Sequence, residues 1–217
     1  MDWQLLWESF PLLLKGAVMT LKLTAIGGSF GIILGTLIGL GRVWGNKLLT
    51  VVLTVYIEVL RGTPLLVQLM IVAFGIPQIL GINYPEFPAA VITIAINSSA
   101  YVAEIIRSGI QGVDKGQMEA ARTLGMSRGM AFRYVILPQA FKRVIPPMVN
   151  EMIALIKESS LVSTVALVEL MRTATLISSR TYKPFTAYIG AALVYLVMTL
   201  TLSQVAGAME RRLRTSD

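Results

Sequence analysis

Three clusters of ionisable and hydrogen-bonding side chains interrupt otherwise apolar stretches of this sequence. They are Glu58; Asn97, Ser98, Ser99 and Tyr101; and Glu158, Ser159 and Ser160. Burying such groups without a partner or a water-filled cavity costs free energy, so each cluster needs an explanation. Together they supply carboxylates, which bind a cationic group, and hydroxyl and amide donors, which bind an anionic one. We predict that these residues line a binding site.

An alternative interpretation gives the same side chains a structural role. Glu58 and Arg61 are three residues apart, a spacing that allows an ion pair on a helix, and Lys157 is adjacent to Glu158. Serine hydroxyls often bond the backbone of their own helix. Tyr101 is as suited to packing as to contact with a ligand. The residue pattern leaves both interpretations open.

The composition excludes several kinds of chemistry. The 217 residues include no cysteine and no histidine, which excludes disulfides, thiolate zinc sites and nucleophile–base pairs built on Cys or His. The phosphate-binding pattern Gly-x4-Gly-Lys-Ser/Thr is also missing. We therefore expect no catalytic residue, metal site or cofactor in this chain. If ATP energises the protein, another subunit must bind the nucleotide.

The chain is too apolar for a soluble domain of its length, with 55% hydrophobic and 14% charged residues and a mean hydropathy of +0.70. The pattern predicts an all-α membrane protein that forms one domain over residues 1–217. The five predicted spans are about 20–42, 48–76, 87–109, 143–165 and 184–210. A basic loop at about 113–138 is assigned to the cytoplasm, which places the N-terminus outside and the C-terminus, with its basic run to Arg214, inside. The net charge of +7 is attributed to such loops and not to nucleic-acid binding.

Several features of the spans lead to structural expectations. Four glycines recur at every fourth position of the first span, which predicts close packing on another helix. They are Gly27, Gly31, Gly35 and Gly39. Pro64 cannot donate a backbone hydrogen bond and should loosen the second span. Residues 3–14 are predicted as an interfacial amphipathic segment, and Pro146 and Pro147 as part of the first turn of the fourth span. Residues 165–180 are predicted as an external surface helix and loop.

The basic loop carries a distinctive pattern. Glu119, Ala120 and Ala121 are followed by Gly125, and then by Val-Ile-Leu ending at Pro138. The pattern predicts two short helices that bend at Gly125, the second ending before the proline, and together forming a knob outside the membrane. Glu119 is placed at the start of the first helix, where its negative charge favours the helix dipole.

This loop resembles the cytoplasmic coupling loop in permease subunits of ABC importers, with Val135 at a position where that family usually has isoleucine. The run Arg61-Gly62-Thr63-Pro64-Leu65-Leu66 resembles the polar amino-acid uptake branch of the same family. The resemblance implies the type I ABC importer transmembrane fold. It also implies that Glu119, Ala120, Ala121, Gly125 and Pro138 couple the chain to an ATPase subunit.

Further partners follow from the same resemblance. It implies two ATPase subunits that bind ATP and Mg, a second copy of this chain or a homologous permease, and an extracytoplasmic amino-acid-binding protein. It places the complex in the cytoplasmic membrane of a bacterium or archaeon. The substrate is then a polar amino acid. The acids in the apolar segments favour a cationic one such as arginine, lysine or histidine.

Two other classes of protein would explain part of the sequence. A stand-alone secondary transporter or channel would explain the spans and the buried acids, but not the coupling pattern, and no repeat relates the halves of the chain. An intramembrane hydrolase would need a base for Ser98 or Ser159, and in the absence of histidine only Lys157 could serve.

Overall fold

The computed structural model describes residues 1–214, except for the side chains of Glu210 and of residues 212–214. Of the basic run predicted to anchor the C-terminus, only the side chain of Arg211 therefore lies within the described part of the chain. The described part of the chain is helical and contains no strand, which confirms the all-α class. The helices are α1 (Trp3–Trp44), α2 (Lys47–Arg61), α3 (Leu65–Met70), α4 (Ile76–Leu80), α5 (Glu86–Gln111), α6 (Lys115–Thr123), α7 (Arg128–Ala131), α8 (Leu137–Glu158), α9 (Leu170–Thr181) and α10 (Pro184–Arg214). Two π-helical segments, η1 (Ile71–Gly75) and η2 (Phe132–Ile136), and the 3-10 segment η3 (Ser159–Val165) connect some of them.

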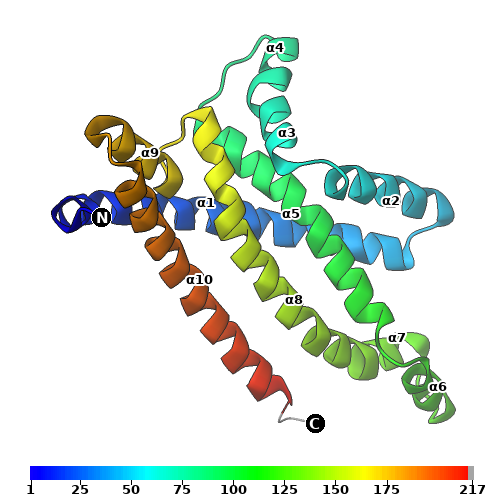
Figure 1. Ribbon diagram of the computed structural model, residues 1–217. Coiled ribbons are helices and arrows are strands. Elements are labelled where there is room, and N and C mark those ends of the chain that lie inside the picture. Colours follow the sequence, from blue (N-terminus) through cyan, green and yellow to red (C-terminus); the bar gives the residue numbers. More distant parts are fainter. Residues whose placement is uncertain (215–217) are drawn as a thin grey trace.

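Helix α1 crosses the bundle formed by α5, α8 and α10, which slope side by side in Figure 1. Its four spaced glycines face α5. A Cβ added at Gly31 would lie 2.7 Å from Cβ of Ser98, and one added at Gly39 would lie 2.8 Å from the carbonyl oxygen of Ala103. The prediction that the glycine track packs on protein is confirmed. The physical reason is that only glycine lets the two backbones approach this closely.

The predicted interfacial segment at the N-terminus is wrong as a separate element. Residues 3–14 belong to the single 42-residue helix α1 and continue directly into the predicted first span. On this part of α1, Leu13 and Ala17 are buried against α9 and α10, whereas Trp3 and Trp7 stay exposed. The Asp2 side chain caps α1 by accepting from the Leu5 N–H and also pairs with Lys183. These bonds, led by the one from Leu5, lower the pKa of Asp2.

The second predicted span is broken. Helix α2 ends at Arg61, and the stretch from Leu65 to Leu80 leaves it at a bend of 101°. The break falls at Gly62, Thr63 and Pro64, where the missing proline donor was expected to loosen the helix. The chain therefore turns sharply within the predicted second span.

Two predictions that placed helix boundaries at prolines are wrong. The helix that begins at Arg128 does not end before Pro138 but continues through η2 into α8. In the π-turn, the Leu137 N–H bonds Phe132 five residues back, and this wider turn accommodates the proline that follows. Pro146 and Pro147 likewise lie inside α8 and not in its first turn. Helix α8 ends at Glu158, seven residues before the predicted end of the fourth span.

Helix α9 lies in the stretch predicted as a surface helix and loop, and it is joined to the bundle by a buried carboxylate that the sequence did not reveal. Glu169 caps α9 by accepting from the N–H groups of Met171 and Arg172 at 2.9 and 2.7 Å. It also accepts from Tyr195 on α10 at 2.9 Å and from Thr20 on α1 at 3.4 Å. One side chain thus links three helices.

Within the described residues, three helices are long and apolar enough to cross a membrane, namely α1, α5 and α10, and the bent stretch Lys47–Leu80 makes four if it counts as one span. Helix α8, the fourth predicted span, is not among them. It carries five charged residues: Lys142, Arg143, Glu151, Lys157 and Glu158.

Candidate functional site

Polar side chains from three helices lie near one another beside the bend of the second span. The guanidinium of Arg61, the last residue of α2, lies 5.4 Å from the ring centre of Tyr101 on α5. Glu151 and Glu158 of α8 interact electrostatically with the same Tyr101, and Arg61 interacts with Glu151. This group of four, called here the polar cluster, combines two carboxylates with one guanidinium.

Ser98 borders the polar cluster from α5. Its side chain is fully buried, and its hydroxyl has no hydrogen-bond partner within the described part of the chain. Glu151 is the carboxylate that interacts with it, although the two do not reach hydrogen-bond geometry. An unpaired hydroxyl next to a carboxylate can donate to a ligand that enters between them.

The structure brings together only three of the predicted binding residues, Ser98, Tyr101 and Glu158. Asn97 donates to Gln68, and Ser99 bonds Tyr56, so both of these buried side chains are already paired. The hydroxyls of Ser159 and Ser160 donate to the carbonyls of Ile156 and Lys157, in the last turn of the preceding helix α8.

Glu58 lies apart from the polar cluster. It is exposed on α2 and forms no ion pair with Arg61 or with any other residue that the structure describes. The alternative of a structural Glu58–Arg61 pair is therefore wrong, because Arg61 lies over the Tyr101 ring instead.

The sequence prediction missed Glu151 and the role of Arg61. Glu151 stands seven residues before Glu158, two helical turns away on the same face of α8, and this spacing was the signal that could have revealed it. The sequence indicates Arg61 only as a counter-ion of Glu58. No local pattern indicates that Arg61 faces Tyr101, because the packing of α2 on α5 sets its position.

A second charged group joins α1 to α5 near the basic loop. Glu104 accepts from Arg42 at 2.9 Å and from Nε of Arg107 at 3.0 Å, and a further bond links Arg107 to Gln111 at the end of α5. One carboxylate between two guanidiniums forms a network that holds the attachment point of the basic loop in place.

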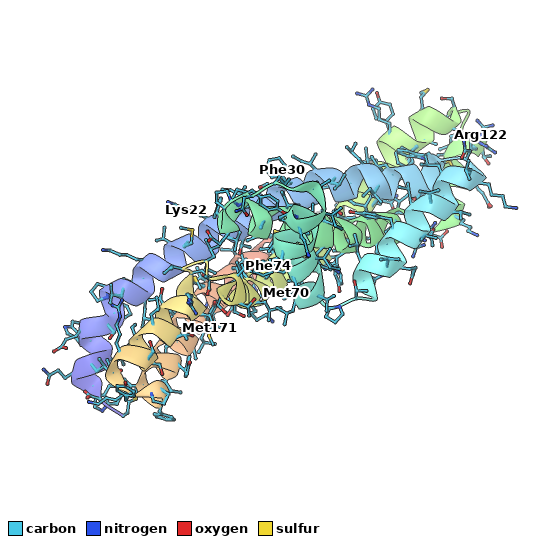
Figure 2. The ribbon with its side chains drawn as sticks, turned by 90° about the horizontal axis from the view of Figure 1, so that it is seen from above. Lys22, Phe30, Met70, Phe74, Arg122 and Met171 are labelled. Carbon is cyan, nitrogen blue, oxygen red and sulfur yellow. The ribbon has the colours of Figure 1, made fainter. Side chains whose placement is uncertain are left out.

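The basic loop forms a knob at one extremity of the molecule, where Figure 2 shows Arg122. Helix α6 ends at Thr123, and Gly125 follows in the left-handed conformation with φ of 86°. The bend predicted at this glycine is confirmed. Leu124 beside it is 82% exposed, so an apolar side chain projects from the tip of a polar knob.

The expected position of Glu119 in the knob is wrong. Helix α6 begins at Lys115 behind the cap residue Asp114, so Glu119 is its fifth residue and not part of its first turn. The interaction of its charge with the helix dipole is therefore weak. Ala120 is exposed, whereas Ala121 is 4% exposed and packs inward.

Comparisons with known proteins agree with this geometry. The family model for the inner membrane component of binding-protein-dependent transport systems matches residues 30–215. The chain is 41% identical over 217 residues to the arginine transport system permease protein ArtQ of Bacillus subtilis, covering 100% of this chain and 99% of that protein. It is 40% identical over 214 residues to the glutamine transport system permease protein GlnP of Escherichia coli K12, covering 98% of each.

Solved structures give the same result. The crystal structure of an amino acid ABC transporter with histidines contains a chain that is 48% identical, with a TM-score of 0.93 over 98% of this chain and 99% of that one. A chain of the inward-facing MetNI methionine ABC transporter shares the fold, with a TM-score of 0.79 over 98% of this chain and 99% of that one, at 18% identity.

These similarities extend over nearly the whole length of both partners in each comparison, and they leave no room for the alternative of a stand-alone secondary transporter. The relatives are transport permeases, a non-catalytic family that works with ATPase subunits and a substrate-binding protein. This chain belongs to the family of inner membrane components of binding-protein-dependent transport systems and is the permease subunit of an amino-acid ABC importer with the type I fold.

Proposed function

We propose that this subunit forms the translocation pathway for a cationic amino acid such as arginine, lysine or histidine. The observation that carries the proposal is the polar cluster, in which Glu151 and Glu158 outnumber the one guanidinium of Arg61. The four residues of the cluster have a formal charge of minus one, and the ammonium of the adjacent Lys157 also acts on Glu158. Glu151, which among the cations of the described residues faces only the guanidinium of Arg61, is therefore the carboxylate that favours a ligand with a positive side chain.

The relatives support this substrate class in part. The permease from Bacillus subtilis is named for arginine, and the solved amino acid transporter contains histidines. The relative from Escherichia coli is named for glutamine, which is neutral and is the competing candidate. The excess of carboxylates in the polar cluster favours the cationic amino acid.

The residues divide between two roles. Glu151 and Glu158 bind the cationic group, Ser98 donates to the substrate, and Arg61 and Tyr101 line the other side. Asn97, Ser99, Ser159 and Ser160 are hydrogen-bonded within the protein and have a structural role. Glu58, exposed on α2, contributes only if a second permease copy brings the pathway to it.

The substrate proposal is tested by binding of arginine and glutamine to the assembled transporter carrying Glu151→Gln. Arginine binding should weaken by about 1.5–3 kcal/mol, roughly 10- to 150-fold, because a hydrogen bond to a charged group is lost, whereas glutamine binding should change less. Glu86→Gln, an exposed acid in the first turn of α5, is the matched control. Equal losses for both amino acids in the Glu151 variant would exclude cation selectivity at this site.

A parallel Glu58→Gln variant decides the role of Glu58. A loss of arginine binding comparable to that in the Glu151 variant would place Glu58 in the pathway. Unchanged binding would remove it from the substrate-binding residues.

We further propose that the knob couples this chain to the ATPase. The exposed residues Glu119, Ala120, Leu124 and Gly125 form a protruding surface with one apolar side chain at its centre, which suits insertion into a cleft of a partner. Ala121 and Pro138 act indirectly, the first by packing α6 and the second by shaping the helix behind it. The partner binds ATP and Mg, and this chain needs no cofactor of its own.

The proposed membrane arrangement has five spans with the N-terminus outside and the C-terminus inside. The Asp2–Lys183 pair holds the N-terminus at the first residues of α10, so the N-terminus lies at the opposite end of that helix from its last residue, Arg214. The knob lies toward the same end as the C-terminus of α10 (Figure 1). With the basic knob in the cytoplasm, the N-terminus is outside.

The proposed complex contains two permeases, either two copies of this chain or one copy and a homologue, together with two ATPase subunits and an extracytoplasmic binding protein. It resides in the cytoplasmic membrane of a bacterium or archaeon. The basic charge of the chain serves this topology, and nucleic acid is not a partner.

A further inference from the structure

The bend between α2 and α3 leaves backbone carbonyls without their helical donors. In a continuous helix, the carbonyl of Leu60 would accept from residue 64, but Pro64 has no N–H. The carbonyl of Thr63 would accept from Val67, whose N–H instead bonds Pro64 at 3.0 Å. Both carbonyls lie in a segment that we place in the membrane, so each needs another donor.

The side chain of Gln68 supplies that donor. Its Nε2 lies 2.7 Å from the carbonyl oxygen of Leu60, 3.2 Å from that of Thr63 and 2.9 Å from the Thr63 hydroxyl. Because carbonyls only accept, the nitrogen of the amide must face the break and its oxygen must face away. Gln68 is 8% exposed, so water competes little for these bonds.

Asn97 holds Gln68 from the other side. Its Nδ2 donates to Oε1 of Gln68 at 3.0 Å, and the residue is 3% exposed. One helical turn further along α5, Tyr101 contacts Arg61. One face of α5 therefore holds both sides of the break, Arg61 before it and Gln68 after it.

We propose that Gln68 and Asn97 are positioning residues, an amide clamp that sets the angle between α2 and α3 and thereby holds Arg61 in the polar cluster. Asn97 then acts through Gln68 and does not contact the substrate. The proposal rests on the proposed function only in assigning Arg61 to the pathway.

The bend angle can be measured without transport. The chain contains no cysteine, so Val55→Cys on α2 and Ile79→Cys on α4, both exposed positions, provide two unique sites for spin labels. The full chain in lipid nanodiscs, diluted with unlabelled chain to suppress signals between copies, should give one narrow distribution of distances between the labels.

Gln68→Glu keeps the shape of the side chain but removes both amide hydrogens that bond the break. Asn97→Asp removes the donor to Gln68. Each variant should broaden the distance distribution and shift it to longer distances as the bend opens. The matched controls are Gln78→Glu and Asn83→Asp, the same substitutions at exposed positions, and they should leave the distribution narrow.

A second-site test separates the clamp from general loss of structure. Pro64→Ala returns an N–H that can bond the Leu60 carbonyl, so the bend should open in this variant and Gln68→Glu should add little to it. Equal effects of Gln68→Glu with Pro64 and with alanine at position 64 would overturn the proposal. An unchanged distribution in Asn97→Asp would also overturn it, whatever Gln68→Glu does.

These outcomes are distinguishable from failure of the proposed function. The label distances require no substrate and no ATPase, so a transporter that proved selective for glutamine would leave them unaffected. If the label distances support the clamp but the Glu151 variant loses arginine and glutamine binding equally, only the proposed substrate class is refuted.

Discussion

Replacing Gly35 by alanine is the most direct test of how α1 packs on α5. The added Cβ would lie 2.6 Å from the carbonyl oxygen of Ser99 and 2.6 Å from Cβ of Val102, both 0.8 Å short of the 3.4 Å at which ordinary contact begins. Neither atom can rotate away, because one belongs to the backbone and the other is attached directly to it. The helices must therefore separate.

Gly28 is the matched control on the same helix. An added Cβ there would meet Sδ of Met152 at 3.0 Å and Cδ1 of Leu155 at 3.4 Å, the ends of flexible side chains that can move. Both substitutions gain the same helix propensity, so this gain cancels when they are compared. The remaining difference is the overpacking cost at Gly35, about 1–3 kcal/mol.

The assay heats the purified complex in detergent at a fixed scan rate and monitors its loss by size-exclusion chromatography. At about 2–4 °C per kcal/mol for a chain of this length, Gly35→Ala should unfold about 2–12 °C below Gly28→Ala. Equal midpoints for the two variants would refute the inference that the glycine track is in tight contact with the α5 backbone.

Three further substitutions test the knob and the anchor of α9. Gly125→Val should abolish transport without preventing membrane insertion, because a side chain in the left-handed conformation costs about 1–2 kcal/mol and strains the bend; wild-type uptake would show that the bend is dispensable. Glu119→Lys should reduce the ATPase that co-purifies with the chain, and a charge reversal on the partner should restore it; undiminished co-purification would remove Glu119 from the interface. Tyr195→Phe removes the donor to Glu169 and should lower stability by about 1.5–3 kcal/mol, which an unchanged thermal midpoint would contradict.

Features that depend on local chemistry were predictable from the sequence. The glycine spacing of the first span, the position of the break at Pro64 and the bend at Gly125 each depend on the backbone properties of one residue type, which hold in any surroundings. The family resemblance rested largely on glycine, proline and alanine residues, whose backbone properties can be recognised from the sequence alone.

Helix ends at prolines were predicted poorly. Pro138, Pro146 and Pro147 lie inside helical segments, because a π-turn absorbs the first and the packing of α8 between α5 and α10 maintains the helix through the other two. Local propensity predicts a stop at each of these residues. Tertiary contacts outweigh that preference, and they involve residues far away in the sequence.

The sequence by itself determined the class of protein, the apolar helices, the knob and the residue types available for a site. Only the tertiary structure decided which of those residues meet. Glu58 and Arg61 are three apart in sequence and both are exposed on α2, yet Arg61 lies over the Tyr101 ring and does not pair with Glu58. Glu151 and Ser98 are distant in sequence and come together because α8 packs on α5. A side chain's partners depend on how helices cross, and the crossing is set by the summed packing of many residues, which no local pattern encodes.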